Sequence, residues 1–327
     1  MSEDKMNRRS FLKASSVIGV GGLVGASALI SACSDGNKMT PLKQPGEFYV
    51  PELPDKAIDG KELKVGLIGC GGRGNGAVEN LLEAANGIKV HALGDVFADR
   101  VEGVRNNLKE KYNQEVPAEN CFVGFDAYKQ VIDSGVDMVI LTTPPVFRPV
   151  HFQYATQKGK HSFLEKPIAV DSKGYRTIMA SAKQAQAKNL SVITGTQRHH
   201  ERPYVEANKQ IQAGMIGEIT GGNVYWNQNM LWYRSREKGW SDMEWMIRDW
   251  VNWKWLSGDH IVEQHVHNID VFLWMSGYKV AKATAFGSRQ RRITGDQYDN
   301  FSVDFEMENG VHLHSMCRQM DGCSNAI

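Results

Sequence analysis

The sequence predicts an α/β protein whose first domain is a doubly wound parallel sheet. Short apolar runs at residues 64–68, 136–141 and 161–164 have the length and composition of buried parallel strands. Helical patterns lie between these runs and continue after them, over about 172–188. Repeated strand–helix units form such a sheet, and its ligands bind beyond the carboxyl ends of the strands.

From about Thr194 the pattern changes, because longer strand candidates replace the short apolar runs. These candidates lie at residues 218–226, 279–286, 300–307 and 311–316. We therefore expect a second, α+β domain. The expected divisions of the chain are a signal at 1–33, a proline-containing tether at 34–61, the parallel-sheet domain at 62–193 and the second domain at 194–327.

The composition is that of an ordinary globular protein. The 327 residues are 42% hydrophobic and 23% charged, and the formal net charge of +1 gives no general attraction to nucleic acid or anionic membranes. The five cysteines show no CxxC spacing, so a zinc knuckle or a thioredoxin-type site is not expected. Cys317 and Cys323 are compatible with either a disulfide or two free thiols.

The N-terminus has the features of an export signal. Arg8 and Arg9 precede an apolar run at 14–30, and the small residues before Cys33 resemble a lipobox. A single transmembrane anchor is the alternative, although the run is at the short limit for a span. We expect export by the twin-arginine route, lipidation of Cys33 and a periplasmic, membrane-anchored protein.

A glycine-rich turn follows the first apolar run and identifies a dinucleotide-binding Rossmann domain. Gly69, Gly71 and Gly74 form GxGxxG, in which the glycines permit a tight turn and close approach of a pyrophosphate. Gly72 and Arg73 lie within the motif, at the start of a helix whose N–H groups would face the phosphates. Asp95, after the second strand, is placed to bind the ribose hydroxyls and favours NAD, whereas nearby Arg100 leaves NADP open.

Beyond this turn, the order of motifs resembles the glucose–fructose oxidoreductase/inositol dehydrogenase (Gfo/Idh/MocA) family. The motifs are Thr143-Pro144-Pro145 with His151, then Glu165-Lys166-Pro167, then the segment 211–219, and the resemblance covers about 62–320. It implies a second domain with an open, mostly antiparallel sheet. It also implies cofactor contacts from Thr143, Pro144, His151, Glu165 and Lys166. Because relatives run further, we expect the second sheet to be incomplete at Ile327.

The resemblance also points to a catalytic helix. The family pattern is Asp, then His four residues later, then Asp three residues later, and it matches Glu263, His267 and Asp270, with glutamate in the first place. Glu263 and His267 would share one helix face, where His267 can act as general base and Glu263 can orient it. Lys166 would stabilise the negative charge that develops on the hydroxyl oxygen. His265 and His267 would face apart on a helix, so we expect no metal site.

A concentration of tryptophan indicates a carbohydrate ligand. All eight tryptophans lie between Trp226 and Trp274, and flat aromatic rings pack well against sugars, although a tryptophan-rich core or interface is an alternative. Residues in and near this region are our substrate-binding candidates. They are His199, His200, Trp232, Tyr233, Arg248 and His265.

These features together predict an NAD(P)-dependent oxidoreductase that acts on a secondary hydroxyl of a sugar or polyol. Free NAD is scarce outside the cytoplasm, so we expect a tightly retained cofactor. We also expect a homo-oligomer, either a dimer or a tetramer. One alternative is a glycoside-cleaving enzyme that works through a transient keto-sugar. The other is a non-catalytic sugar-binding lipoprotein, which the fold alone does not exclude.

Overall fold

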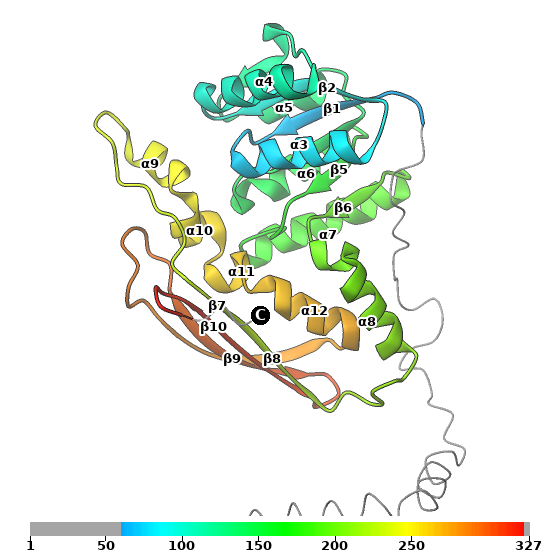
Figure 1. The fold of residues 1–327 in the computed structure, drawn as a ribbon, viewed down its shortest axis with the longest axis vertical. Coiled ribbons are helices and arrows are strands. Elements are labelled where there is room, and N and C mark those ends of the chain that lie inside the picture. The colour runs from blue at the N-terminus through cyan, green and yellow to red at the C-terminus, as the bar shows by residue number, and fades with distance from the viewer. Residues whose placement is uncertain (1–59, 324–327) are drawn as a thin grey trace, which may run out of the picture.

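The first domain is a six-stranded parallel sheet covered by helices on both faces. The computed structural model describes residues 60–323 and shows this domain above a second one (Figure 1). The strand order is β3-β2-β1-β4-β5-β6. The strands are β1 (Leu63–Ile68), β2 (Ile88–Asp95), β3 (Cys121–Val123), β4 (Met138–Leu141), β5 (His161–Leu164) and β6 (Val192–Thr194).

Two hydrophobic clusters hold these helices against the sheet. One includes Val65, Leu67, Val78 and Leu108, and the other includes Ile68, Val131, Val139 and Phe152. Because side chains alternate along a strand, neighbours such as Leu67 and Ile68 serve opposite faces. The helices are α3 (Gly72–Ala84), α4 (Ala98–Tyr112), α5 (Ala127–Asp133), α6 (Arg148–Gln157) and α7 (Ser172–Ala187).

The second domain is a four-stranded sheet with helices on the side that faces the first domain (Figure 1). Its order is β7-β10-β9-β8, in which β10 pairs antiparallel with β9 and parallel with β7. The strands are β7 (Gly221–Gln228), β8 (Val280–Ser288), β9 (Asn300–Met307) and β10 (His312–Gln319). The helices are α8 (Arg202–Gln212), α9 (Asp242–Arg248), α10 (Lys254–Ser257), α11 (His260–Glu263) and α12 (Val266–Ser276).

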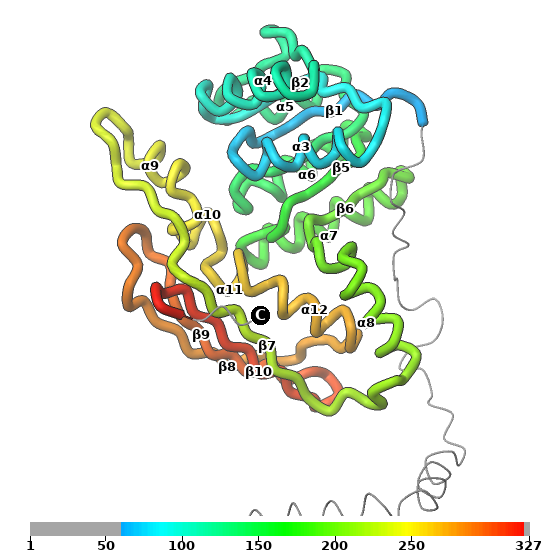
Figure 2. Tube along the Cα trace, in the orientation of Figure 1, coloured from blue at the N-terminus to red at the C-terminus, as the bar shows by residue number. Residues whose placement is uncertain are grey.

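The path between β7 and α11 brings the second domain up to the first. After β7 the chain rises to α9, then returns through α10 and α11 to the sheet (Figure 2). α12 packs on the sheet, where the Asn268 amide donates to the Tyr225 carbonyl and the His265 ring bonds the Ser315 hydroxyl. α11 and α12 therefore lie between the sheet and the first domain.

The predicted fold class is confirmed: a parallel sheet is followed by a domain with a mostly antiparallel sheet. β5 and β9 have the predicted bounds, whereas β7 begins at Gly221 rather than 218 and β3 was not predicted. The export signal, Cys33 and the tether up to residue 59 lie outside the described residues. Over residues 60–323, no helix combines the length and apolarity needed to cross a membrane. Cys317 and Cys323 are free thiols.

Candidate functional site

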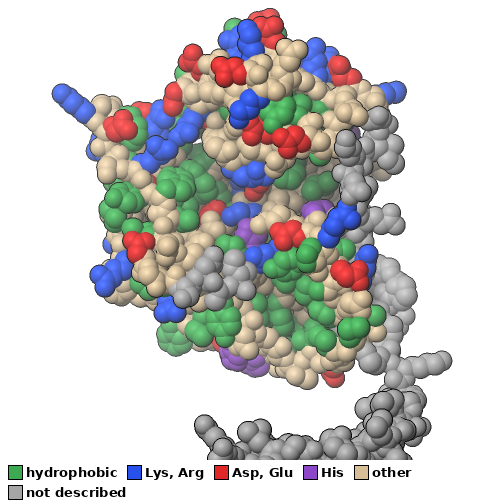
Figure 3. All heavy atoms as spheres, viewed as in Figure 1, with side chains coloured by type: hydrophobic (Ala, Val, Ile, Leu, Met, Phe, Trp, Pro, Cys, Tyr) green, Lys and Arg blue, Asp and Glu red, His purple; other side chains and the backbone are tan. Residues whose placement is uncertain are grey.

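Two cavities meet at the carboxyl ends of the parallel strands. The glycine-loop cavity, of about 400 Å³, is lined by the turn after β1. The Lys166 cavity, of about 1110 Å³, runs along β4, β5 and β6 and beside α3 to the carboxyl ends of these strands, where residues of the second domain also line it. Both are lined by Arg73, Thr142, Thr143 and Trp250. Charged side chains and histidines gather between the two domains on the face in Figure 3.

The glycine-loop cavity has the shape that a dinucleotide phosphate needs. Gly69 has φ +100°, and a Cβ on Gly74 would lie 1.9 Å from the Gly69 carbonyl oxygen, so α3 can start only with glycine there. Gly71 and Gly72 face open space. Because the N-terminus of α3 opens into this space, its free N–H groups can bind a phosphate. The residues present therefore fit NAD.

Asp95 closes the ribose side of the same cavity. One carboxylate oxygen accepts from the Cys70 N–H at 2.7 Å and the other from the Phe97 N–H at 3.0 Å. Burial raises the pKa of Asp95, and these backbone bonds act against that rise. A carboxylate oxygen has two acceptor positions, so both oxygens remain able to bind hydroxyls.

Nine of the predicted cofactor residues line the glycine-loop cavity, and three do not. The nine are Gly69, Gly71, Gly72, Arg73, Gly74, Asp95, Arg100, Thr143 and Pro144. Glu165 and Lys166 line the Lys166 cavity instead. The Glu165 carboxylate accepts from Arg73 Nε at 2.6 Å and from the Lys166 N–H at 3.0 Å, so it holds the two loops together.

His151 does not line the glycine-loop cavity; its ring is buried and lines a smaller pocket that shares Asp95, Thr143 and Pro144 with that cavity. It stacks on Tyr128 at 4.2 Å, and its Nδ1 lies 3.3 Å from the Thr143 hydroxyl. Burial and the nearby Arg148 guanidinium lower the pKa of His151 to about 3. A neutral ring in this position lies against the Thr143 side chain and supports it.

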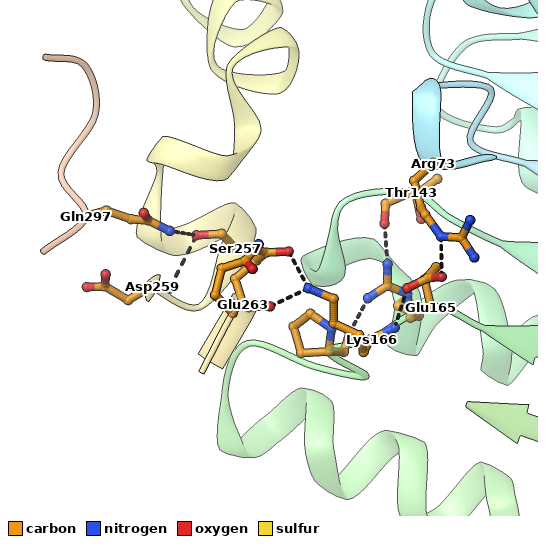
Figure 4. Close-up of polar contacts among 11 residues, drawn as sticks. Arg73, Thr143, Glu165, Lys166, Ser257, Asp259, Glu263 and Gln297 are labelled. Atoms are coloured by element: carbon orange, nitrogen blue, oxygen red, sulfur yellow. Dashed lines mark hydrogen bonds and ion pairs between the residues drawn. The ribbon is translucent and has the colours of Figure 1, made fainter. Parts of the chain in front are cut away.

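Lys166 and Glu263 form a buried ion pair between the domains (Figure 4). Lys166 Nζ donates to Glu263 Oε1 at 2.9 Å and to the Glu263 carbonyl oxygen at 2.5 Å. The helix breaks at this carbonyl: α11 ends at Glu263, and the His267 N–H bonds the Gln264 carbonyl instead. The expectation of one helix with Glu263 orienting His267 is therefore wrong, because Lys166 binds both the carboxylate and the carbonyl that a continuous helix would use.

His267 lies at the wall of the Lys166 cavity as a neutral base. Its ring stacks on Trp226 at 5.5 Å, and the Arg198 guanidinium lies 5.4 Å from the same indole. Burial, then the charges of Lys166 and Arg198, lower the pKa of His267 to about 3. No hydrogen bond from the described residues contributes to this shift, and the ring lines the cavity, so it is available to a ligand.

Of the predicted substrate-binding residues, only His200 lines the Lys166 cavity. His199 is withdrawn from it, because its Nε2 bonds Asp270 at 2.7 Å and its ring stacks on Trp274. His265 is fully buried against Ser315 on the sheet.

The other three candidates lie around the Trp-rich segment, which we define as residues 229–253. Trp232 and Arg248 line the glycine-loop cavity, and exposed Tyr233 lines neither cavity. The Arg248 guanidinium is paired with Asp99 of the first domain at 3.0 Å. Across the described residues, no cluster of three or more His, Cys, Asp or Glu side chains could hold a metal ion.

Arg148 is a site residue that the sequence analysis missed. Its side chain is buried, and its guanidinium donates to the Thr143 carbonyl at 2.6 Å and to the Pro167 carbonyl. Burial lowers its pKa to about 10, so it remains charged at neutral pH. The signal was an arginine in the first turn of the helix after a strand-end loop. Trp250, which lines both cavities, was also missed.

Two family models match the chain and together cover most of both domains. An oxidoreductase family with an NAD-binding Rossmann fold matches residues 63–194, and the GFO/IDH/MocA C-terminal domain matches residues 204–323.

Curated relatives of two kinds match the chain at 22–24% identity. A glycosyl hydrolase family 109 protein of Shewanella sp. (strain W3-18-1) is 24% identical over 229 residues, which are 69% of this chain and 47% of the relative. The scyllo-inositol 2-dehydrogenase (NAD(+)) of Bacillus subtilis is 22% identical over 240 residues, 72% of this chain and 60% of the relative. The chain spans about half the length of the first of these.

Solved structures share the fold. The myo-inositol 2-dehydrogenase from Lactobacillus plantarum has a TM-score of 0.62 at 22% identity, with 81% of this chain and 73% of that chain covered. The scyllo-inositol dehydrogenase from Lactobacillus casei, solved with NAD(H) and scyllo-inositol, has a TM-score of 0.61 at 20% identity, with 81% and 72% covered.

Proposed function

Because the chain belongs to the Gfo/Idh/MocA family of NAD-binding oxidoreductases, we propose that it oxidises or reduces a secondary hydroxyl of a sugar or polyol. One observation supports this most directly. Lys166 and His267 line one cavity, and that cavity meets the glycine-loop cavity at Arg73, Thr142 and Thr143. A hydroxyl bound by Lys166 and His267 is therefore next to the space for a dinucleotide.

The two side chains divide the proton chemistry between them. Glu263 accepts from Lys166 Nζ twice, so one of the three ammonium N–H groups is left to donate to the substrate oxygen. Burial and the charges of Lys166 and Arg198 keep the His267 ring neutral at neutral pH, so a ring nitrogen can accept the hydroxyl proton. NAD held in the glycine-loop cavity would supply the hydride acceptor, and the oxidised substrate would be a carbonyl compound. The Lys166 charge stabilises the oxygen as its negative charge grows.

We propose NAD rather than NADP as the cofactor. The Asp95 carboxylate lies at the ribose side of the cavity, where it would repel a 2′-phosphate. Arg100 lines the same cavity, and its charge acts on Asp95 to lower the pKa of that carboxyl, against the larger effect of burial.

The first experiment is to purify the full chain in detergent, denature it and identify any released dinucleotide by mass spectrometry. We expect NAD in an amount close to that of the protein. The NAD-loaded protein is then mixed with inositols and sugars, and absorbance at 340 nm reports reduction. If the protein binds NAD but no polyol or sugar reduces the bound NAD, the proposed reaction is contradicted.

A second candidate is cleavage of a glycoside through transient oxidation of the sugar. The similarity to glycosyl hydrolase family 109 proteins supports it, and Lys166 and His267 would serve in both reactions. Product analysis with a disaccharide separates the two. Dinucleotide-dependent release of a monosaccharide favours cleavage, whereas an intact keto-sugar favours the dehydrogenase.

A non-catalytic sugar-binding protein is the remaining alternative. The Lys166→Ala/His267→Ala double variant tests it, since loss of turnover with retained sugar binding shows that the chemistry resides in these residues. A wild-type protein with tight sugar binding and no turnover supports the binding protein instead.

We also propose that the protein is an exported lipoprotein that retains its cofactor, and that it forms a homo-oligomer. The arginine pair at residues 8 and 9 and the lipobox-like residues before Cys33 support export and lipidation. Labelling with a radioactive fatty acid should mark the wild type and not Cys33→Ala. Equal labelling of both contradicts the lipid anchor.

A further inference from the structure

The glycine-loop cavity has a second wall that comes from the other domain. Opposite the glycine turn, it is lined by Trp232, Arg234, Ile247, Arg248 and Trp250. All five belong to the Trp-rich segment, which rises from β7 to α9 and returns (Figure 2). A dinucleotide in this cavity is therefore enclosed between the domains.

Arg248, at the end of α9, makes the contact that holds this wall in place. Its Nη1 and Nη2 bond the two carboxylate oxygens of Asp99 at 3.1 and 3.0 Å. The guanidinium carbon also lies 3.8 Å from the centre of the Phe97 ring, and Glu244 binds Nε at 3.0 Å. A two-pronged arginine–carboxylate pair with a cation–π contact fixes both position and orientation.

The residues that Arg248 contacts are connected to the cofactor site itself. The Phe97 N–H donates to the Asp95 carboxylate, which also accepts from Cys70 in the glycine turn. Asp99 lies in the first turn of α4, directly after these residues. Movement of α9 therefore changes the packing next to the ribose side of the cavity.

We propose that the Trp-rich segment covers the bound dinucleotide and that the Arg248–Asp99 pair keeps it closed, which makes Arg248 a positioning residue for cofactor retention. This inference rests on the proposed function, because it takes NAD as the ligand. Release of the dinucleotide requires α9 to separate from α4. Removing the pair should therefore raise the dissociation rate much more than it lowers the association rate.

The test measures NADH release from the full chain in detergent. Protein loaded with NADH is mixed with excess NAD, and the loss of NADH fluorescence gives the dissociation rate. Arg248→Ala and Asp99→Asn should each raise this rate roughly ten-fold, as expected for loss of a charge pair and a cation–π contact. The association rate should change less than about three-fold.

Arg236→Ala is the matched control. Arg236 lies in the same segment and pairs with Asp242 at 2.7 Å, but it does not line the cavity. Its removal should leave NADH release unchanged. Asp99→Arg alone and Arg248→Asp alone should each release NADH fast. The double variant that carries both substitutions restores an ion pair of opposite orientation and should release NADH slowly again.

Three results would overturn the inference. They are wild-type release rates in a folded Arg248→Ala protein, equally fast release from Arg236→Ala, or no recovery in the exchanged pair. If the wild type takes up neither NAD nor NADH, the proposed function fails. Hydrogen–deuterium exchange of residues 242–252 in the free protein then tests closure alone. Faster exchange in Arg248→Ala than in Arg236→Ala supports closure, and equal exchange rejects it.

Discussion

The two domains bury different kinds of side chain. Among the described residues, 25 of the 35 buried hydrophobic side chains lie before Thr194, whereas 17 of the 23 buried polar or charged ones lie after it. Both hydrophobic clusters belong to the first domain. In the second domain, Glu263, His265 and His267 are all buried. Glu263 forms the ion pair with Lys166, and His265 bonds Ser315 on the sheet.

This difference shows where the stability and where the chemistry of the molecule are concentrated. The first domain presents backbone N–H groups on an apolar scaffold. The same fold can be formed by many sequences and can serve many functions. The second domain buries titratable groups, and several lack partners: among the described residues, both ring nitrogens of His260 and Nδ1 of His265 make no hydrogen bond. Such groups reduce stability, which is common where a site performs chemistry.

The largest effect should come from the second domain's base. His267→Ala should lower kcat by about 10²- to 10⁴-fold, since in the proposed reaction this side chain accepts the hydroxyl proton. Binding of NAD, measured by fluorescence, should stay within about three-fold. His312→Ala, on the exposed face of the sheet, is the control and should keep full activity. Equal losses in both variants would contradict the assignment.

Acid should unfold the second domain before the first. Burial lowers the pKa of His151, His260 and His267 to about 3 and that of His265 to about 4, and three of these four lie in the second domain. Unfolded histidines take up protons near pH 6.5, so stability falls as the pH drops below that value, by about 1.4 kcal/mol per histidine per pH unit.

Asp259 acts in the opposite direction. Burial raises its pKa to about 6, so its contribution is present at low pH and is lost as the pH rises through 6. Between about pH 4 and 6, its effect on the free energy of unfolding therefore cancels that of one histidine. Because all eight tryptophans lie in the second domain, their fluorescence during urea titrations at pH 8 to 4.5 reports that domain alone. A midpoint that does not change with pH would show that these histidines are not buried as neutral rings.

A smaller effect should separate the glycines of the first domain. Gly74→Ala places a Cβ 1.9 Å from the Gly69 carbonyl oxygen and should cost about 1–3 kcal/mol of unfolding free energy, as overpacking does. Gly72→Ala faces open space and should change stability by less than about 0.5 kcal/mol, yet weaken NAD binding. Urea denaturation and fluorescence titration measure the two effects. If Gly72→Ala were less stable than Gly74→Ala, the tight contact would lie at Gly72 and not at Gly74.

The smallest effect should be on the exposed face of the second sheet. Lys282 lies 3.1 Å from Glu306 across β8 and β9, with most of its side chain in solvent. Lys282→Ala should change the free energy of unfolding by less than about 1 kcal/mol. A larger loss in urea denaturation would show that this face is as sensitive as the buried one.

The first domain could be predicted from sequence because its signals are local. β5 matched its apolar run, and the glycine spacing placed Gly69, Gly74 and Asp95 around one cavity. β3 was missed because it has only three residues, too few for a strand pattern to be recognised.

The second domain's site depends on contacts between residues distant in the chain. The helix break after Glu263 requires Lys166, 97 residues earlier, and Arg248 is paired with Asp99, 149 residues earlier. Hydrophobic periodicity describes only the local segment, so it cannot predict contacts with residues that lie about a hundred positions away in the chain. Lys166 and His267 were found through the family motif. The signal for Arg148, an arginine in the first turn of a helix after a strand-end loop, is weak because surface arginines share it.

The position of β10 has a consequence for how the protein is made. β10 lies between β7 and β9, although it is the last of the three to leave the ribosome. The first sheet can assemble once Thr194 has emerged, but β7 must wait with unpaired backbone groups until His312–Gln319 has been synthesised. The half of the molecule with the glycine turn can thus fold early in translation, and the half with His267 is completed only after β10 has been synthesised.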